Sequence, residues 1–423
     1  MPVSNEVVVL GAGMVGTATA LALQARGYDV VLLDRNEPGS ETSYGNAGVI
    51  QGEACEPYAL PRDIATLWRI ARKTDNSVDW DLPGLWRLAP SLFTYWRNSA
   101  PARHRRTSLA YAALIRRATR DHAGWIAASA SEALIRREGY RLIFRDSASF
   151  EVQARKAEKW RALYGIGYDR EDSAALAIAE PALRRPLAGA IRWHDAWTCS
   201  DPGALVKAYA AYFGRRGGSL VKADLCGLEQ SGRGWRVLSS AGPIETENVV
   251  VALGPWSPQA LEPLGYRVSL IRKRGYHMHV EYPRADADPS NTRLNLLLID
   301  AAIGAVYAPM RAGLRVATGA DLSAIEPDGM PRQLERAYAA ARDLLDLGAP
   351  VANSRWAGMR PCTPDMLPLV GAAPRHRGLW FNFGHGHQGF TLGPTTGNLL
   401  AGVMAGDSVD DVLPLAPSRL ATA

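Results

Sequence analysis

The sequence predicts an α/β fold in which two domains are interleaved along the chain. Near the N-terminus, a glycine-rich turn joins an apolar strand pattern to a helix pattern, which is typical of a Rossmann-like nucleotide-binding domain. From Val268 to Asp321 several short strand patterns follow one another, which predicts the antiparallel sheet of a second, α+β domain. Patterns of the first kind return in the middle of the chain and near its end, so we expect each domain to be built from separated segments.

The composition is that of a globular protein long enough for two domains: 423 residues, of which 47% are hydrophobic and 21% charged. The net charge of +6 comes largely from arginine, as in the cluster Arg103, Arg105 and Arg106. Such a cluster is more often a solvated helix end than a patch for nucleic acid or anionic membrane, and we expect no nucleic-acid partner. No apolar run reaches the about 20 residues of a membrane span, and no export signal is recognisable. The four cysteines lie far apart, which predicts no disulfide framework and fits a reducing cytoplasm.

The first expected element is a strand over Val7–Leu10, and a G-x-G-x-x-G turn connects it to a helix over Thr17–Arg26. A second strand, Asp29–Leu33, ends at Asp34. The glycine motif alone is weak, but this order of strand, turn, helix, strand and acid is specific for a dinucleotide. The alternative is a glycine turn in an ordinary βαβ unit.

Each residue of this motif has a physical role. Gly11 permits the tight turn, Gly13 lets the backbone approach a pyrophosphate, and Gly16 allows the helix to pack closely on the strand. The N-terminus of the helix offers free N–H groups and the positive end of its dipole to the phosphates. Asp34 can accept hydrogen bonds from ribose hydroxyls, and its charge disfavours a 2′-phosphate. The motif does not separate NAD from FAD.

The next part of the chain is expected to be mainly helical. A tryptophan-rich helical segment follows Pro61 and is predicted to break at Pro83 and Pro90, and a long amphipathic helix pattern comes after it. A strand is expected over Glu138–Arg145 and a helix over about Phe150–Leu163.

Patterns of the α/β kind resume at Asp201, which can cap a helix that Gly217 ends. Strands are expected over Ser219–Leu225 and Val249–Leu253, and the second runs into a turn that contains Gly254 and Trp256. These patterns assign residues 1–60, 195–262 and 353–423 to the nucleotide-binding domain and residues 61–194 and 263–352 to the substrate or cap domain.

Two stretches carry a resemblance to a known family. The run "ETSYGNAGVIQGE", Glu41–Glu53, is a small, polar loop unlike that of a nicotinamide enzyme, and it can follow a dinucleotide toward a flavin ring. The run "WAGMRPCTPDMLPLVG", Trp356–Gly371, is similar to a W-x-G-x-R-P-x-T-P-D signature, and a "GHG" loop and a helix pattern follow it. Over nearly the whole chain this resembles the FAD-dependent D-amino acid dehydrogenase family, within the D-amino acid oxidase and glycine oxidase superfamily.

The resemblance implies a Rossmann-like FAD-binding domain. FAD is expected to be held without a covalent bond, because relatives with covalent flavin carry their cysteine nearer to Gly358 than to Cys362. A helix starting near Gly393 is expected to direct its N-terminus at the flavin's N1–C2=O edge. The expected contacts with FAD come from the glycine motif, the small polar loop, the second strand-end turn and the closing loop. They are Gly11, Gly13, Met14, Val15, Gly16, Asp34, Arg35, Thr42, Ser43, Asn46, Ala47, Gly48, Leu225, Ala252, Gly254, Trp256, Gly386, Gln388, Gly389, Phe390 and Thr391.

For the substrate, the resemblance points to Arg360, at the position of an arginine that grips the carboxylate of an amino acid. A guanidinium group can hold a carboxylate by two parallel hydrogen bonds and so fix its orientation. The alternative is that Asp365 neutralises Arg360 and the pair is structural. Tyr276 and Tyr307 fall on expected sheet strands, and each is either a substrate contact or a core residue.

His387 and Gln388 depart from the threonine and leucine that the family usually carries after its GHG loop, and Tyr44 departs from a small residue. These polar side chains favour a D-hydroxyproline-like substrate over a small D-amino acid such as alanine. His385 and His387 are two residues apart and no third ligand is in view, so we expect no metal site.

The implied reaction is hydride transfer from the substrate's Cα to flavin N5, which gives an imino acid and then a 2-oxo acid, with electrons passed to a quinone or another carrier. His387, His277 and Glu53 are equal candidates for the group that accepts the amine's proton, and the alternative is that the substrate binds with its amine already neutral. An oxidase or demethylase acting with oxygen on an N-alkyl or secondary amino acid is one alternative, and a non-catalytic flavin-binding subunit of a larger complex is another. The expected location is the cytoplasm, with peripheral association at the inner membrane as in relatives.

Overall fold

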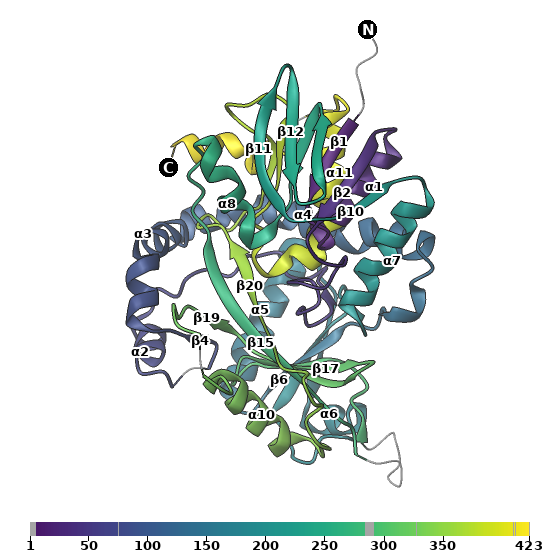
Figure 1. Ribbon diagram of the computed structural model, residues 1–423. Coiled ribbons are helices and arrows are strands. Elements are labelled where there is room, and N and C mark those ends of the chain that lie inside the picture. The colour runs from purple at the N-terminus through teal and green to yellow at the C-terminus, as the bar shows by residue number, and fades with distance from the viewer. Residues whose placement is uncertain are drawn as a thin grey trace.

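The computed structural model describes residues 6–74, 76–283, 292–326, 328–408, 410 and 412–422. Two main sheets of different kinds lie one above the other in Figure 1, each with helices packed against it. The α/β fold class predicted from the sequence is confirmed. Of the helices among the described residues, none is long and apolar enough to cross a bilayer.

The upper sheet has six strands in the order β10–β2–β1–β14–β22–β21, parallel except for β21, which runs antiparallel to β22. The central position of β1 explains its valine-rich sequence, because a parallel strand is covered on both faces. The strands are β1 (Glu6–Leu10), β2 (Asp29–Asp34), β10 (Ser219–Lys222), β14 (Asn248–Val251), β21 (Leu369–Ala372) and β22 (Leu379–Phe383).

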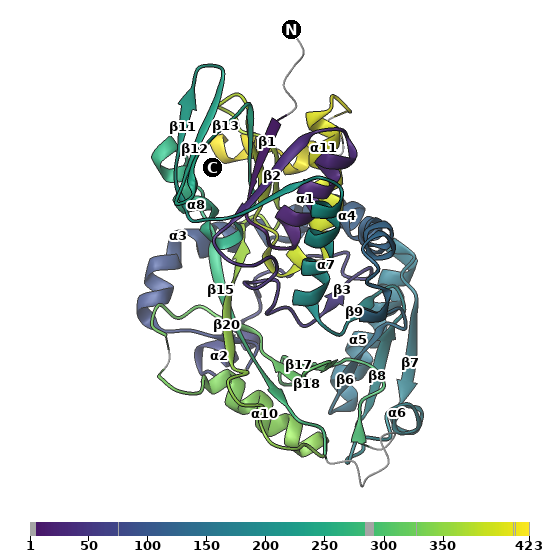
Figure 2. The same cartoon turned by 45° about the vertical axis from the view of Figure 1, so that its right-hand side comes forward.

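Helices α1 (Met14–Ala25) and α11 (Gly389–Met404) lie side by side on one face of this sheet (Figure 2). A Cβ atom at Gly393 would lie 2.8 Å from Cγ of Met14, so glycine is what allows the two helices to approach this closely. The other face is covered by an antiparallel meander of β11 (Leu225–Ser231), β12 (Gly234–Ser239) and β13 (Gly242–Thr246).

The lower sheet contains ten strands in the order β4–β19–β15–β18–β17–β16–β6–β8–β7, with β20 paired to β15. The neighbours from β15 to β16 pair antiparallel, as predicted, whereas β16 pairs parallel with β6 and β4 pairs parallel with β19. The strands are β4 (Val78–Asp79), β6 (Tyr140–Phe144), β7 (Tyr168–Asp172), β8 (Gly189–Trp193), β15 (Ile271–Val280), β16 (Leu298–Asp300), β17 (Ala305–Met310), β18 (Gly313–Ala317), β19 (Ala320–Asp321) and β20 (Trp356–Cys362).

Helix α10 (Arg332–Leu344) packs on the outer face of the lower sheet. Strand β20 belongs to a segment that the sequence assigns to the nucleotide-binding domain, yet it pairs with β15 of this sheet. The remaining elements are α4 (Pro101–Ala128), α5 (Ser147–Tyr164), α6 (Ser173–Ala179), α7 (Pro202–Arg215), α8 (Ser257–Leu261) and the small sheet of β3 (Val49–Ile50), β9 (Trp197–Cys199) and β5 (Ile135–Arg136).

The tryptophan-rich segment forms α2 (Ile64–Ala71) and α3 (Leu82–Asn98), and α3 continues through Pro90, so the predicted break there is wrong. Pro83 lies in the first turn, where its missing N–H costs nothing. Pro90 deprives the carbonyl of Trp86 of its helical donor, but Trp86 is 85% exposed and water can take that place.

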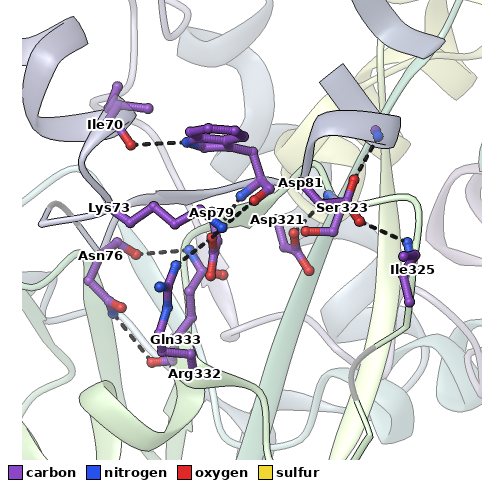
Figure 3. A network of polar contacts seen from close by, with 12 residues as sticks. Ile70, Lys73, Asn76, Asp79, Asp81, Asp321, Ser323, Ile325, Arg332 and Gln333 are labelled. Carbon is purple, nitrogen blue, oxygen red and sulfur yellow. Dashed lines mark hydrogen bonds and ion pairs between the residues drawn. The ribbon is translucent and has the colours of Figure 1, made fainter. Parts of the chain in front are cut away.

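Polar contacts tie this helical segment to the lower sheet (Figure 3). The carboxylate of Asp81 caps α3 and also accepts hydrogen bonds from the backbone N–H groups of Ala324 at 3.0 Å and Ile325 at 3.1 Å. Asp79 pairs with Arg332 of α10 at 2.6 Å. These bonds fix α2 and α3 beside the space between the two main sheets.

Candidate active site

A cavity of about 1510 Å³ lies between the upper and lower sheets. Pockets for small ligands are usually about 300–1,000 Å³, so this one has room for a large cofactor together with a substrate. Of the residues predicted to bind cofactor or substrate, all but five line it. The five that do not are Gly16, Gly48, Gln388, Thr391 and Tyr307.

The glycine motif forms the upper end of the cavity. Gly11 has a φ of +104°, and a Cβ atom there would lie 2.6 Å from the carbonyl oxygen of Ala252. A Cβ at Gly16 would lie 1.8 Å from the carbonyl oxygen of Gly11, so Gly16 lets α1 pack on the turn. A Cβ at Gly13 would meet only Ser43, at 3.4 Å, which leaves open the space in front of the helix N-terminus.

The surroundings of this N-terminus fit a dinucleotide. The hydroxyl of Ser43 accepts a hydrogen bond from the N–H of Met14 at 2.9 Å, so the small polar loop is held against the first turn of α1. The hydroxyl oxygen of Thr42, in the same loop, is buried and has no partner in the described part of the chain. A buried polar atom without a partner is costly, and a bound polar ligand would satisfy it.

Asp34 closes β2 as predicted and lines the cavity. Its carboxylate accepts hydrogen bonds from the N–H groups of Ala12 at 2.6 Å and Asn36 at 2.9 Å. Burial raises the pKa of this carboxyl, and the two backbone bonds oppose that rise. Arg35 lies with its guanidinium carbon 4.6 Å from the centre of the Trp256 ring, which makes an aromatic and cationic wall at the nucleotide end.

Arg315, on β18, holds the small polar loop from the side of the lower sheet. Its guanidinium donates to the carbonyl oxygen of Tyr44 at 2.8 Å and to that of Asn46, and its Nε donates to His279 at 3.1 Å. Burial lowers the pKa of Arg315 to about 10. Sequence reasoning missed this residue, because nothing in the run "GLRVATG" indicates which distant backbone its arginine reaches.

The closing loop leads through a single 3-10 turn, Gly386–Gln388, into α11. The helix therefore begins at Gly389, whereas the sequence predicted a start near Gly393. Pro394 lies inside this helix and has no N–H for the carbonyl of Phe390. His122 of α4 supplies the missing donor, because its Nε2 lies 3.0 Å from that carbonyl oxygen.

His122 is fully buried, and burial lowers its pKa to about 4. Its Nδ1 lies 3.0 Å from the hydroxyl of Tyr209 and its Nε2 faces carbonyl oxygens, so the neutral ring carries its proton on Nε2. Sequence reasoning missed His122 because proline, the signal for an unsatisfied carbonyl, lies more than two hundred residues away.

The two histidines of the closing loop have separate surroundings. His385 bonds to the hydroxyl of Thr396 at 2.9 Å, and burial lowers its pKa to about 3. His387 faces the cavity, and its pKa is lowered to about 3, first by burial and then by the charges of Arg360 and Lys273. Among the described residues no group of three or more His, Cys, Asp or Glu side chains could hold a metal ion.

Arg360 projects from β20 into the lower part of the cavity. It donates to the carbonyl oxygens of Gly319 at 2.6 Å and Thr318 at 3.1 Å. Within the described residues no carboxylate oxygen lies within 4.0 Å of its guanidinium group. Asp365 instead pairs with Arg419 at 2.7 Å, so the alternative in which Asp365 neutralises Arg360 is wrong.

The two candidate tyrosines both pack in the hydrophobic core of the lower sheet, but only Tyr276 is also among the residues that line the cavity. Tyr276 lines the cavity, and its hydroxyl donates to the carboxylate of Asp321 at 2.5 Å. Tyr307 is 0% exposed, packs in the hydrophobic core of the lower sheet and does not line the cavity. Its role as a substrate contact therefore has no support from its place in the fold, because a ring buried on the other side of the sheet cannot reach a ligand.

A polar cluster that includes Glu53, at the end of the small polar loop, also lines the cavity. Glu53 accepts hydrogen bonds from Gln51 at 2.6 Å and from the hydroxyl of Tyr140 at 2.9 Å, while its Oε2 has no partner in the described part of the chain. Burial raises the pKa of Glu53 to about 7. Gln388 does not line the cavity, but its side-chain amide donates a hydrogen bond to Gln51 and so supports this cluster from behind.

Tyr58 and Lys273 also line the cavity, and sequence reasoning did not select them. Tyr58 is 70% exposed, but its surroundings are the cavity walls, and its ring lies 4.8 Å from that of His387. Lys273 stands next to Arg360 on the neighbouring strand. Only the strand register reveals this neighbour, since the two residues are far apart in sequence.

A sheet of the nucleotide-binding type that faces a mixed sheet across a large cavity, with an arginine that has no carboxylate partner in the described chain, is the arrangement expected of a two-part nucleotide-dependent oxidoreductase. The model of a protein family described as FAD dependent oxidoreductase matches residues 6–403, so the chain belongs to this family and FAD is its cofactor. This confirms the resemblance seen in the sequence.

Curated relatives span the same length. The D-amino-acid oxidase of Bradyrhizobium diazoefficiens is 29% identical over 99% of this chain and 98% of its own. The D-amino acid dehydrogenase of Paramagnetospirillum magneticum is 30% identical over 95% of each chain. The crystal structure of glycine oxidase from Geobacillus kaustophilus covers 98% of both chains with a TM-score of 0.73 at 20% identity, which shows a shared fold.

Proposed function

We propose that the protein dehydrogenates an amino acid, most closely a D-amino acid, at its Cα–H bond. The observation that carries this proposal is the guanidinium group of Arg360, which reaches the cavity with two carbonyl partners and, within the described residues, no carboxylate. A carboxylate ligand would complete it by a charge-assisted pair of hydrogen bonds. FAD, when bound, accepts the hydride; the residues of the chain bind and orient the substrate and take up its proton.

Glu53 is the best-suited of the three candidate proton acceptors. Its pKa of about 7 means that it can take up a proton near neutral pH, and its Oε2 is free of partners in the described chain. His387 lines the cavity, but a pKa of about 3 makes it a weak base. The pKa of His277 is about 2 and the residue does not line the cavity.

The proposed FAD contacts are those predicted residues that line the cavity. The division of the chain into a nucleotide-binding domain (1–60, 195–262 and 353–423) and a substrate domain (61–194 and 263–352) also stays a proposal. The relatives' names support both acceptor classes, because one relative is called an oxidase and the other a dehydrogenase. A quinone or another carrier stays our first proposal for the acceptor, with oxygen and an N-alkyl or secondary amino acid as the second. A non-catalytic subunit is disfavoured, since electron relay has no need of Arg360.

Peripheral association of a cytoplasmic protein with a membrane also stays a proposal. Trp68 of α2 and Trp86 of α3 are 58% and 85% exposed, beside arginines such as Arg69 and Arg87, and aromatic side chains of this kind suit a membrane interface. Sedimentation of the holoenzyme with anionic vesicles checks it, and a Trp86→Glu variant that sediments equally well would contradict this surface.

The function is tested by anaerobic reduction of the holoenzyme. D-amino acids, N-methyl amino acids and D-hydroxyproline are added singly, loss of flavin absorbance is followed, and oxygen is then admitted to separate an oxidase from a dehydrogenase. Failure of every amino acid to bleach the flavin would favour the non-catalytic subunit.

Arg360→Ala should raise KM greatly and lower kcat/KM by about 100-fold, as expected for loss of a two-bond charged contact. Arg355→Ala, a nearby arginine that does not line the cavity, is the matched control. A nearly normal KM in Arg360→Ala would remove Arg360 from the substrate site.

A further inference from the structure

Lys273 places a second positive charge on the cavity wall beside Arg360. The two residues are directly opposite each other in the antiparallel register of β15 and β20. Their side chains therefore leave the same face of the sheet, with Cβ atoms about 5 Å apart. Both side chains line the cavity, and both are partly exposed toward it.

Neither of these two cations is paired with a carboxylate in the part of the chain that the structure describes. Within the described residues, no carboxylate oxygen lies within 4.0 Å of Lys273 or Arg360. Two other buried arginines of the lower sheet have carboxylate partners, Arg141 with Glu180 at 2.5 Å and Arg274 with Asp321 at 3.8 Å, whereas the single cation Arg315 is held by backbone carbonyls and His279. Buried charges are usually paired in this way, so two adjacent cations without a carboxylate indicate a site for an anion.

The contacts of Lys273 hold its side chain in place and leave its ammonium group able to donate hydrogen bonds to an anion. Its ammonium nitrogen lies 4.5 Å from the centre of the Tyr95 ring and 3.4 Å from the Tyr95 hydroxyl. An ammonium group has three protons to donate, and Tyr95 is the one hydrogen-bonding partner seen for it in the described chain. Glu53, an acid that also lines the cavity, is bonded to Gln51 and Tyr140.

We propose that the substrate carries a second carboxylate, so that Arg360 binds the α-carboxylate and Lys273 binds the carboxylate of the side chain. This inference rests on the proposed function, since it places an amino acid in the cavity. The spacing of opposite residues suits two carboxylates separated by two or three carbon atoms, as in aspartate and glutamate. It differs from the hydroxylated ring that His387 and Gln388 favoured in the sequence, because a ring with one carboxylate leaves Lys273 without a partner.

Binding of simple carboxylates to the holoenzyme tests this directly. Malonate, succinate and glutarate are compared with propionate, butyrate and pentanoate, respectively, by calorimetry and by perturbation of the flavin spectrum. We expect the best dicarboxylate to bind about 10- to 100-fold more tightly than the monocarboxylate of equal chain length, from one added charged hydrogen bond. D-aspartate or D-glutamate should likewise exceed D-alanine and D-hydroxyproline in kcat/KM.

Three variants assign the effect to Lys273. Lys273→Met should remove the preference for dicarboxylates and leave monocarboxylate affinity within about twofold, whereas Lys273→Arg should keep the preference. Arg272→Met is the matched control, because Arg272 is adjacent in β15 but points to the opposite face and does not line the cavity. If Lys273→Met fails to fold, the comparison of the two carboxylate series on the unmodified holoenzyme still decides.

Equal affinity for dicarboxylates and monocarboxylates would overturn the inference while leaving the proposed function intact, provided that monocarboxylates bind and Arg360→Ala abolishes their binding. An equal loss of preference in Arg272→Met would also overturn it, since the effect would then be one of general charge. If no carboxylate binds and no amino acid reduces the flavin, the proposed function itself fails together with the inference.

Discussion

His122 and Pro394 provide the most quantitative prediction. In the unmodified protein, the imidazole Nε2 donates to the carbonyl of Phe390, 3.0 Å away, because Pro394 has no N–H to offer. Replacing His122 with Phe keeps the ring but leaves this buried carbonyl without a donor. A stranded buried acceptor costs about 1–3 kcal/mol, and the Tyr209 hydroxyl can still reach the carbonyl of residue 122 at 3.4 Å, so we expect a loss of about 2 kcal/mol.

A double-mutant cycle isolates this bond. Pro394→Ala restores a backbone N–H that can donate to Phe390, so His122→Phe should cost less than about 1 kcal/mol in that background. The stability is measured by urea unfolding of the holoenzyme with saturating FAD, followed by tryptophan fluorescence. An equal cost of His122→Phe with proline and with alanine at position 394 would refute the account of the bond.

The same residue makes a prediction about pH. The pKa of His122 is about 4 in the folded protein, against an ordinary value of about 6.5, so the unfolded chain binds more protons between these values. Stability from this group is complete above pH 6.5 and is lost as the pH falls toward 4. Between pH 7.5 and 5.5 the loss is about 1.3 kcal/mol, which follows from the two pKa values. The cost of His122→Phe should therefore shrink by about that amount at pH 5.5, and a constant cost would contradict it.

Two further variants probe the cofactor end. Asp34→Ala should increase the loss of FAD on dialysis, because the carboxylate at the end of β2 is proposed to hold the ribose; unchanged flavin content would count against this role, with the exposed Asp29→Ala as control. Arg315→Met should destabilise the small polar loop and weaken FAD retention by about 10-fold or more, since several charge-assisted hydrogen bonds to backbone carbonyls are lost. An Arg315→Met protein that keeps FAD as tightly as the unmodified protein would show that the loop does not depend on this anchor.

The nucleotide end of the site could be predicted from the sequence because its determinants are local. Gly11, Gly16 and Asp34 belong to one βαβ unit, and their backbone roles follow from spacing alone. Helix boundaries were less accurate, since α11 begins at Gly389 through a 3-10 turn that no pattern announces. The continuation of α3 through Pro90 depends on exposure to water, which the pattern does not contain.

The substrate end could be predicted only in part, because its residues meet through long-range pairing. Arg360 was found through a resemblance, whereas Lys273 became its neighbour through the register of β15 and β20. The partner of Asp365 is Arg419, near the C-terminus, and no rule of spacing connects them. Tyr307 lay on the predicted strand, but the side of the sheet that it faces depends on what packs there.

Arg315 shows how the two sheets are combined into one site. Its guanidinium belongs to the lower sheet, yet it binds the carbonyl oxygens of Tyr44 and Asn46 in the loop that follows the nucleotide-binding unit. The same lower sheet carries Arg360 and Lys273. The loop proposed to contact the cofactor and the cations proposed to bind the substrate are therefore positioned by the same sheet. A small shift of this sheet would move both together, which preserves the distance between them on which hydride transfer depends.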